Sequence, residues 1–323
     1  MTTTFYKTVW GEGAVNCEKS VEKLKELLND PVNFTPQRTH EWYEMRKKVL
    51  TASCFYDICV TGGATSTRIL NEKLFPDMFP RQEFIYSLPL FHGCRCESVA
   101  NSYYEYITGT SIHNFGLIVS KKETYIAASP DGINNKGILV EFKCPYSREL
   151  IPGKVPLKYL YQIYGQLLSC ELTRCDYVEC IFKKQPTKET WLARKGIDKS
   201  ILVFTHDIVE GVDDSKNWVA PFGCDLERML DLAMQEVQLR LAKRTETERI
   251  QMYYITLTDF NLVPVTYDDE FVREYMLPNL KMTADKMKIL KEPLKENMPK
   301  GKACKPPPLI SAVEKNGKLT IVK

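Results

Sequence analysis

Residues 129–145 have the sequence SPDGINNKGILVEFKCP, and their pattern is the basis for predicting the fold. Its second half alternates in character, because Val140 and Phe142 are apolar while Glu141 and Lys143 are charged. Successive side chains of a strand point to opposite faces, so the acid and the base share one face and the apolar pair can pack on the other. Asp131 stands at a turn just past the preceding predicted strand. If the two strands pair as a hairpin, Asp131 comes to lie beside Glu141.

Two carboxylates held close together repel unless a cation lies between them, and such an all-oxygen site suits Mg²⁺ or Mn²⁺. The backbone carbonyl of Phe142 can add a further oxygen ligand. A bound metal lowers the pKa of its water and polarises a phosphoryl oxygen, while Lys143 can orient that water or stabilise developing negative charge. This pattern favours phosphodiester hydrolysis. A plainer interpretation stays open, since Asp-Gly is a common turn pair and Glu and Lys two apart are typical of a solvated strand face.

Outward from this stretch, apolar periodicity predicts helices before and after a group of strands. The predicted helices are Glu18–Asn29, Thr39–Val49 with Thr39 as N-cap, Ser53–Cys59, Ser66–Leu74, Gly93–Ile107, Leu157–Leu172, Leu226–Lys243 and Phe271–Leu290. The predicted strands are Phe115–Val119, Tyr125–Ala128, Ile138–Phe142, Tyr177–Phe182, Leu202–Thr205 and Tyr253–Leu257. This order predicts an α/β (α+β) fold with a central mixed β-sheet flanked by helices.

Composition narrows the class of protein. The 323 residues are 44% apolar and 26% charged, which is ordinary globular usage. No run approaches the roughly 18 uncharged apolar residues of a membrane span, and Met1–Gly13 lacks the basic-then-apolar pattern of a secretory signal. We therefore expect a soluble, intracellular protein that does not associate with a membrane. In a chain this long without a visible secretory signal, the eleven cysteines are expected to be reduced thiols. A structural zinc site is not expected, because none of them forms the paired Cys-x-x-Cys pattern.

Further motifs occur in order around the central stretch. Arg46 is followed by Thr51-Ala52-Ser53, Gly93-x-x-x-Glu97 lies in a predicted helix, and Tyr159-Leu160-Tyr161-Gln162 follows downstream. Together they resemble the lambda-type exonuclease or YqaJ-like viral recombinase family of the PD-(D/E)xK nuclease superfamily. The resemblance covers roughly Trp42 to Leu172 and implies a restriction-endonuclease-like core. Four motifs in the family's order are much more specific than one.

The resemblance implies a role for each matched residue. Asp131, Glu141, Glu97 and the Phe142 carbonyl would hold Mg²⁺, typically two ions, with Mn²⁺ as an alternative. Lys143 and Gln162 would complete the catalytic centre. Arg46, Ser53 and Ser129 would contact the 5′-phosphate and the DNA.

Each of these residues also has a structural interpretation. Arg46 can belong to a solvated basic face with Lys47 and Lys48, and Ser53 can simply cap a helix. Glu97 can be a surface residue of its helix. Gln162 can hydrogen-bond within the core. His92 and His113 have no ligand-spaced partner and receive no role.

The predicted domain organisation is one nuclease domain over residues 1–290, with an N-terminal helical part to about residue 90 and the core over about 91–260. Residues 291–323 are predicted to be a basic, Pro- and Lys-rich tail. Lys281–Lys323 holds eleven Lys and four acidic residues, a local balance of +7 against +3 for the whole chain. Such a segment suits a polyanionic partner, although a solvated tail explains it equally well.

From the resemblance we expect a metal-dependent 5′→3′ exonuclease that degrades one strand of linear double-stranded DNA in recombination, repair or viral DNA processing. Its substrate would carry a free 5′ end, and a single-strand annealing protein or further copies of the chain could join it. A viral protein would act in the host cytoplasm or nucleus. Two alternatives stay open: a structure-specific or RNA/DNA endonuclease of the same superfamily, and a non-catalytic nucleic-acid-binding protein.

Overall fold

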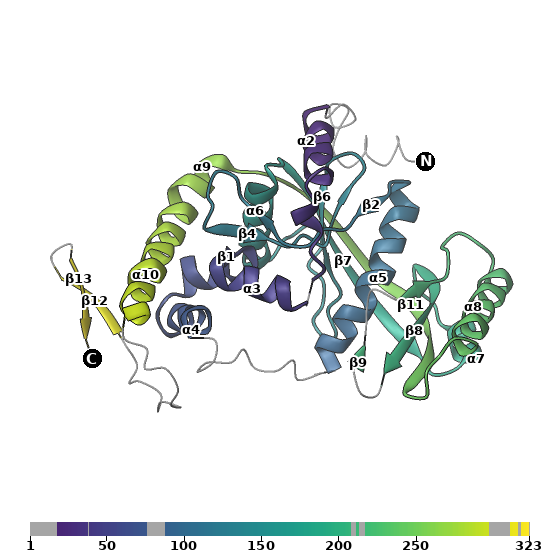
Figure 1. Cartoon of the computed structure of the whole chain (residues 1–323). Helices are drawn as coiled ribbons and strands as arrows, with labels where there is room; N and C mark the ends of the chain where they lie inside the picture. Colours follow the sequence, from purple (N-terminus) through teal and green to yellow (C-terminus); the bar gives the residue numbers. More distant parts are fainter. Residues whose placement is uncertain are drawn as a thin grey trace.

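The computed structural model describes residues 18–37, 39–75, 88–207, 211–212, 217–296, 311–315 and 318–322. Its centre is an eight-stranded sheet in the order β10-β8-β11-β7-β6-β5-β2, with β9 paired to β8 (Figure 1). The strands are β2 (Ile112–His113), β5 (Gly132–Asn134), β6 (Leu139–Lys143), β7 (Arg174–Gln185), β8 (Asp198–Asp207), β9 (Gly211–Val212), β10 (Trp218–Val219) and β11 (Glu248–Thr266). Strands β6 and β7 are parallel, whereas the other pairs in this sheet are antiparallel. The predicted mixed sheet is therefore confirmed.

The alternation in β6 distributes its side chains between two hydrophobic clusters. Val140 and Phe142 pack with Val99 and Tyr103 of α5 (Leu88–Thr108) on one face. Leu139 packs on the other face in the cluster that contains Ile163 of α6 (Leu157–Cys170). Both faces of β6 are thus covered by helices, and Glu141, on the α6 face, is fully buried.

A second, three-stranded sheet joins the N-terminal helices to α6. It has the order β1-β4-β3 and consists of β1 (Leu50–Thr51), β3 (Ile118–Val119) and β4 (Ile126–Ala128). After β1, the short 3₁₀ helix η3 (Ala52–Cys54) runs against α6. Gly165 permits this close approach, because a Cβ atom there would lie 2.5 Å from the Phe55 ring and 2.9 Å from the Ala52 side chain.

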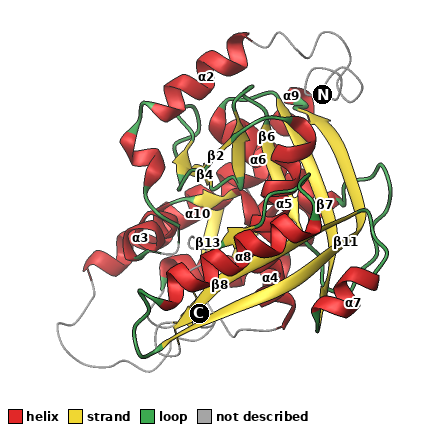
Figure 2. Cartoon of the chain, turned by 90° about the vertical axis from the view of Figure 1, so that its right-hand side faces the viewer, coloured by secondary structure: helices red, strands yellow, loops and turns green. Residues whose placement is uncertain are grey.

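The remaining helices lie around this core. On the N-terminal side are α2 (Glu18–Leu28), η2 (Pro31–Phe34), α3 (His40–Lys48), the π-helical turn η4 (Asp57–Thr61) and α4 (Gly63–Leu74). On the C-terminal side are α7 (Lys188–Ala193), α8 (Leu226–Leu241), α9 (Asp269–Phe271), the π-helical turn η6 (Val272–Met276) and α10 (Leu277–Glu296). Helices α4 and α10 lie at one end of the molecule and α7 and α8 at the other (Figure 1). Figure 2 shows α8 across the long strands β8 and β11.

Several predicted boundaries need correction. Ser53 does not cap a helix, because it lies inside η3, whose N-cap Thr51 makes no side-chain capping bond. Several short strands were not predicted, among them β1, β2, β9, β10, and β5 within the predicted turn after Asp131. The predicted strand Tyr253–Leu257 is part of the 19-residue β11, whose bulge and Pro264 obscure the alternation.

The start of the predicted tail also differs from the structure. Helix α10 continues to Glu296, and β12 (Ser311–Lys315) pairs with β13 (Lys318–Val322). Other predicted elements are confirmed, among them the Thr39 N-cap, whose side chain accepts a hydrogen bond from the Trp42 N–H at 3.3 Å. In the described part of the chain, no helix has the length and apolar character needed to cross a membrane.

Candidate active site

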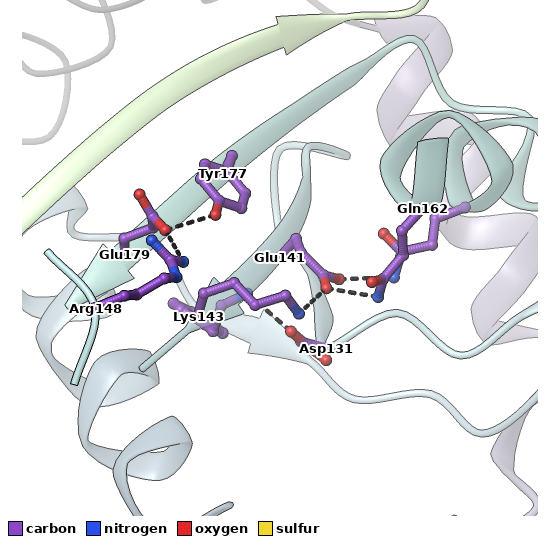
Figure 3. A network of polar contacts seen from close by, with 9 residues as sticks. Asp131, Glu141, Lys143, Arg148, Gln162, Tyr177 and Glu179 are labelled. Carbon is purple, nitrogen blue, oxygen red and sulfur yellow. Dashed lines mark hydrogen bonds and ion pairs between the residues drawn. The ribbon is translucent and has the colours of Figure 1, made fainter. Parts of the chain in front are cut away.

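The β5–β6 hairpin places Asp131 beside the middle of β6. Gly132 pairs with Val140 in this hairpin. Asp131 Oδ2 then accepts a hydrogen bond of 2.8 Å from the Phe142 N–H, which holds the carboxylate against β6 (Figure 3). Asp131 lies beside the Glu141 strand as predicted, but the predicted hairpin partner was wrong. The hairpin is formed by β5, whereas the predicted strand Tyr125–Ala128 corresponds to β4 and pairs with β1 and β3.

Glu141 lies at the centre of a hydrogen-bonded group between β6 and α6. Its Oε1 accepts hydrogen bonds from the Lys143 ammonium and, at 2.6 Å, from the Gln162 amide. Its Oε2 accepts one from the Gln166 amide at 2.7 Å. Gln162 and Gln166 reach the same carboxylate because residues four apart lie on one face of a helix. Figure 3 shows Glu141 between Gln162 on one side and Lys143 on the other.

Three acidic side chains interact electrostatically here. Burial raises the pKa of Asp131 well above its ordinary value, and the charges of Glu141 and Glu97 raise it further. Burial alone would lower the pKa of Lys143, but the Glu141 and Asp131 carboxylates outweigh it and hold that pKa above its ordinary value. Glu97, a half-buried residue of α5, therefore lies close enough to act on Asp131.

A pocket of about 200 Å³ adjoins this centre on the α3 side. Its lining includes Arg46, Ser53, Ser129, Gln162 and Gln166. The three residues predicted to bind phosphate thus share one pocket, and the two glutamines connect it to Glu141. Asp131, Glu141 and Lys143 do not themselves line it.

The Arg46 guanidinium is held in a defined position at this pocket. Its Cζ atom lies 4.4 Å from the centroid of the Trp42 ring, one helical turn earlier, and one of its N–H groups donates to Thr51 Oγ1 at 3.3 Å. The Trp42 indole N–H donates to Ser129 Oγ at 3.1 Å. Thr51 and Ser53 lie side by side, with their hydroxyl oxygens 3.4 Å apart. A guanidinium is a planar group of N–H donors whose geometry suits an anion such as phosphate.

Sequence reasoning missed Gln166, Trp42 and Thr51 as parts of the site. The spacing of Gln166, one helical turn after Gln162, was the only signal for it. The Gln166 Oε1 atom is buried and has no hydrogen-bond partner within the described residues. A donor from water or from a ligand would satisfy this acceptor.

The donor set fits a hard divalent cation. Within the described residues, no three His, Cys, Asp or Glu side chains are arranged to hold a metal ion by themselves. Mg²⁺, however, is commonly bound by one or two carboxylates together with water and substrate oxygens. Asp131 and Glu141 supply two carboxylates, and Glu141 Oε2 accepts only one hydrogen bond from the described residues. The role of the Phe142 carbonyl as a metal ligand stays a prediction.

Comparison with known proteins agrees with the motifs. Residues 41–173 match the family described as the YqaJ-like viral recombinase domain. This part of the chain is therefore similar to that family, and the predicted resemblance from Trp42 to Leu172 is confirmed. Uncharacterized protein R354 of Acanthamoeba polyphaga mimivirus is 28% identical over 166 residues, which are 45% of this chain and 29% of that protein. The aligned segment thus spans less than a third of that relative.

Solved structures with similarity to the chain include exonucleases. LHK-Exo, an alkaline exonuclease from Laribacter hongkongensis, is 17% identical with a TM-score of 0.49, over 80% of this chain and 97% of that one. LHK-Exo in complex with dAMP gives 18% identity with the same coverage and TM-score. A phage-related exonuclease from Haemophilus somnus 129PT is 14% identical with a TM-score of 0.41, over 77% of this chain and 95% of that one.

Proposed function

We propose that the protein is a metal-dependent 5′→3′ exonuclease that degrades one strand of linear double-stranded DNA. The observation that carries this proposal is the position of the Asp131, Glu141 and Lys143 group next to the Arg46 pocket. The two glutamines of α6 connect these two parts. A terminal phosphate bound at Arg46 would have a fixed position relative to the carboxylates. An exonuclease needs such a fixed position, because it cleaves at a set distance from the end of the strand.

Different residues bind the 5′-phosphate and the metal. Arg46, with Ser53 and Ser129, binds the 5′-phosphate. Asp131 and Glu141, with Glu97 and the Phe142 carbonyl, hold Mg²⁺ or Mn²⁺, with two ions expected. When bound, the metal supplies Lewis-acid activation of water and phosphate.

Two further groups of residues position these ligands and the nucleophile. Lys143 orients the attacking water and balances negative charge on the phosphate. Gln162 and Gln166 keep the Glu141 carboxylate fixed by donating to both of its oxygens.

The family description supports a place in viral DNA recombination or processing. A single-strand annealing protein is the partner that would use the single strands left by such an enzyme. The same proposal includes two further points: the protein can assemble with further copies of itself, and it acts in the cytoplasm or nucleus of a host cell.

The decisive experiment compares linear duplexes that differ only at the 5′ end, phosphate or hydroxyl, with and without Mg²⁺. A closed circular duplex of the same sequence is the control. We expect Mg²⁺-dependent release of nucleotides from the phosphorylated linear duplex and none from the circle. Cleavage of the circle would instead establish an endonuclease. Binding without cleavage in any divalent metal would indicate a non-catalytic binding protein.

Arg46 provides the sharper test of polarity. Arg46→Ala should reduce the preference for phosphorylated over hydroxyl 5′ ends by roughly tenfold or more, because a charge-assisted hydrogen bond is lost. Lys48→Ala, at an exposed position of the same helix, is the matched control. An unchanged preference in Arg46→Ala would remove the basis for 5′ recognition.

A further inference from the structure

A second buried carboxylate lies next to the candidate active site, on β7. Glu179 is only 1% exposed, and its Cα pairs with that of Lys143 across the parallel β6–β7 ladder. Paired residues of neighbouring strands point to the same face of a sheet. Glu179 therefore projects beside Lys143, on the face that α6 covers.

Three donors surround Glu179. Its Oε1 accepts hydrogen bonds from the Arg148 guanidinium and, at 2.7 Å, from the Tyr177 hydroxyl. Its Oε2 accepts one from the Asn261 amide at 3.3 Å. This arrangement fixes Arg148 in the loop after β6, on the far side of Lys143 from Glu141 (Figure 3).

The rest of the Arg148 guanidinium remains available. A guanidinium carries five N–H groups, and within the described residues only two have acceptors: Glu179 and, at 3.4 Å, the Glu149 carbonyl. The side chain is 37% exposed, so solvent or a ligand can reach it. An arginine anchored through one edge by a buried acid loses little rotamer freedom when its other edge binds an anion.

Arg148 also lies close to the Lys143 ammonium. Lys143 Nζ is 5.0 Å and Arg148 Cζ is 5.7 Å from the centroid of the same Tyr159 ring. Because both distances are measured to the same ring centroid, Lys143 Nζ and Arg148 Cζ are at most about 11 Å apart. One DNA strand advances about 3.4 Å per nucleotide along the duplex axis, so two phosphates at most about three nucleotides apart can meet both cations.

We propose that Arg148, anchored by Glu179, binds the backbone phosphate adjacent to the one that is cleaved. Glu179 is then a positioning residue, which acts on DNA only through Arg148. This inference rests on the proposed function, and it adds a contact at the catalytic end of the site, apart from the Arg46 pocket.

The competing explanation is that Arg148 only neutralises a buried acid. Removing Arg148 alone would leave Glu179 uncompensated and could unfold the protein. The double variant Arg148→Met/Glu179→Gln removes both charges, with Met replacing only the aliphatic part of Arg148 and Gln keeping the length of Glu179. It should fold whether Arg148 is structural or binds phosphate, which is why it is the informative variant.

The experiment measures equilibrium binding of a 5′-phosphorylated linear duplex over a range of salt concentrations. All proteins are full-length and carry Asp131→Asn to prevent cleavage. We expect the double variant to bind roughly 10- to 100-fold more weakly at low salt, as for a lost hydrogen bond to a charged group. Its plot of log affinity against log salt should be shallower by about one unit, as for one lost phosphate contact.

Two further variants sharpen the result. Glu179→Gln alone keeps the cation and loses the anchor, so it should weaken binding while leaving the salt slope unchanged. Arg194→Met, at an exposed arginine after α7, is the matched control and should change neither quantity. In an otherwise unsubstituted chain, Arg148→Met/Glu179→Gln should raise KM more than it lowers kcat.

Each outcome has a distinct meaning. Should the folded double variant bind with the affinity and salt slope of its Asp131→Asn parent, Arg148 is a structural ion-pair partner and the inference is wrong. If the unsubstituted chain cleaves the duplex, that failure concerns Arg148 alone. If the unsubstituted chain neither binds nor cleaves duplex DNA, the proposed function and this inference both fall.

Discussion

Lys143→Met tests whether the ammonium of Lys143 compensates the buried charge of Glu141. Glu141 is fully buried, and its side chain contacts a Lys143 side chain that is 22% exposed. Removing one partner of a buried ion pair typically costs about 3–5 kcal/mol. Here Gln162 and Gln166 still donate to the carboxylate at 2.6 and 2.7 Å. We therefore expect the free energy of unfolding to fall by about 2–3 kcal/mol, at or below the low end of that range.

The assay is urea denaturation with EDTA, repeated with Mg²⁺. The double variant Glu141→Gln/Lys143→Met has no buried charge at either position, so it should recover most of the loss. Because a divalent cation can take the place of the ammonium beside the carboxylates, Mg²⁺ should stabilise Lys143→Met more than the unsubstituted protein. The double variant lacks the Glu141 carboxylate and should gain less from Mg²⁺. Neither variant should cleave DNA.

Two results would refute this reasoning. A loss below about 0.5 kcal/mol in Lys143→Met, the usual effect of a surface substitution, would mean that the ammonium does not compensate Glu141. A double variant no more stable than Lys143→Met would mean that the lost stability comes from side-chain packing and not from an uncompensated carboxylate.

Three further predictions follow from particular contacts. Gly165→Ala should lower the free energy of unfolding by about 1–3 kcal/mol and reduce kcat. The reason is that the new Cβ would lie 2.5 Å from the Phe55 ring and displace α6. An unchanged melting temperature and an unchanged kcat would contradict this prediction. In EDTA, the unsubstituted protein should lose stability relative to Asp131→Asn as pH rises above 3.8, because burial and neighbouring carboxylates raise the pKa of Asp131. Protonated Asp131 contributes to the stability of the folded state below that pH, and this contribution is lost as the pH rises through the raised pKa of the folded protein. A difference in unfolding free energy between the two proteins that does not change with pH would contradict the prediction. Deletion of residues 297–323, which hold six Lys and one Glu, should weaken DNA binding at low salt and change it little at high salt; equal binding at every salt concentration would identify a solvated tail.

Local sequence carried much of the information about strand β6. The alternation of Val140, Glu141, Phe142 and Lys143 predicts which side chains share a face, because the two-residue period is a property of any strand. The position of Asp131 beside that strand was predicted, but the hairpin that places it there uses β5 and not the predicted strand Tyr125–Ala128. Helix periodicity and the Thr39 cap were correct for the same reason, since both depend on residues within one turn of each other. The family resemblance was readable because its motifs occur in order.

The environment of these residues was decided only by the tertiary structure. A strand with an acid and a base on one face is normally half solvated, yet Glu141 is buried because α6 closes over it. Gln166 joins the site for that reason, although it lies 25 residues away in sequence. Arg148 and Glu179 likewise meet only through the parallel β6–β7 pairing. Sequence periodicity specifies which way a side chain points, but its charge compensation and exposure depend on distant segments that pack against it, and those contacts leave no local pattern.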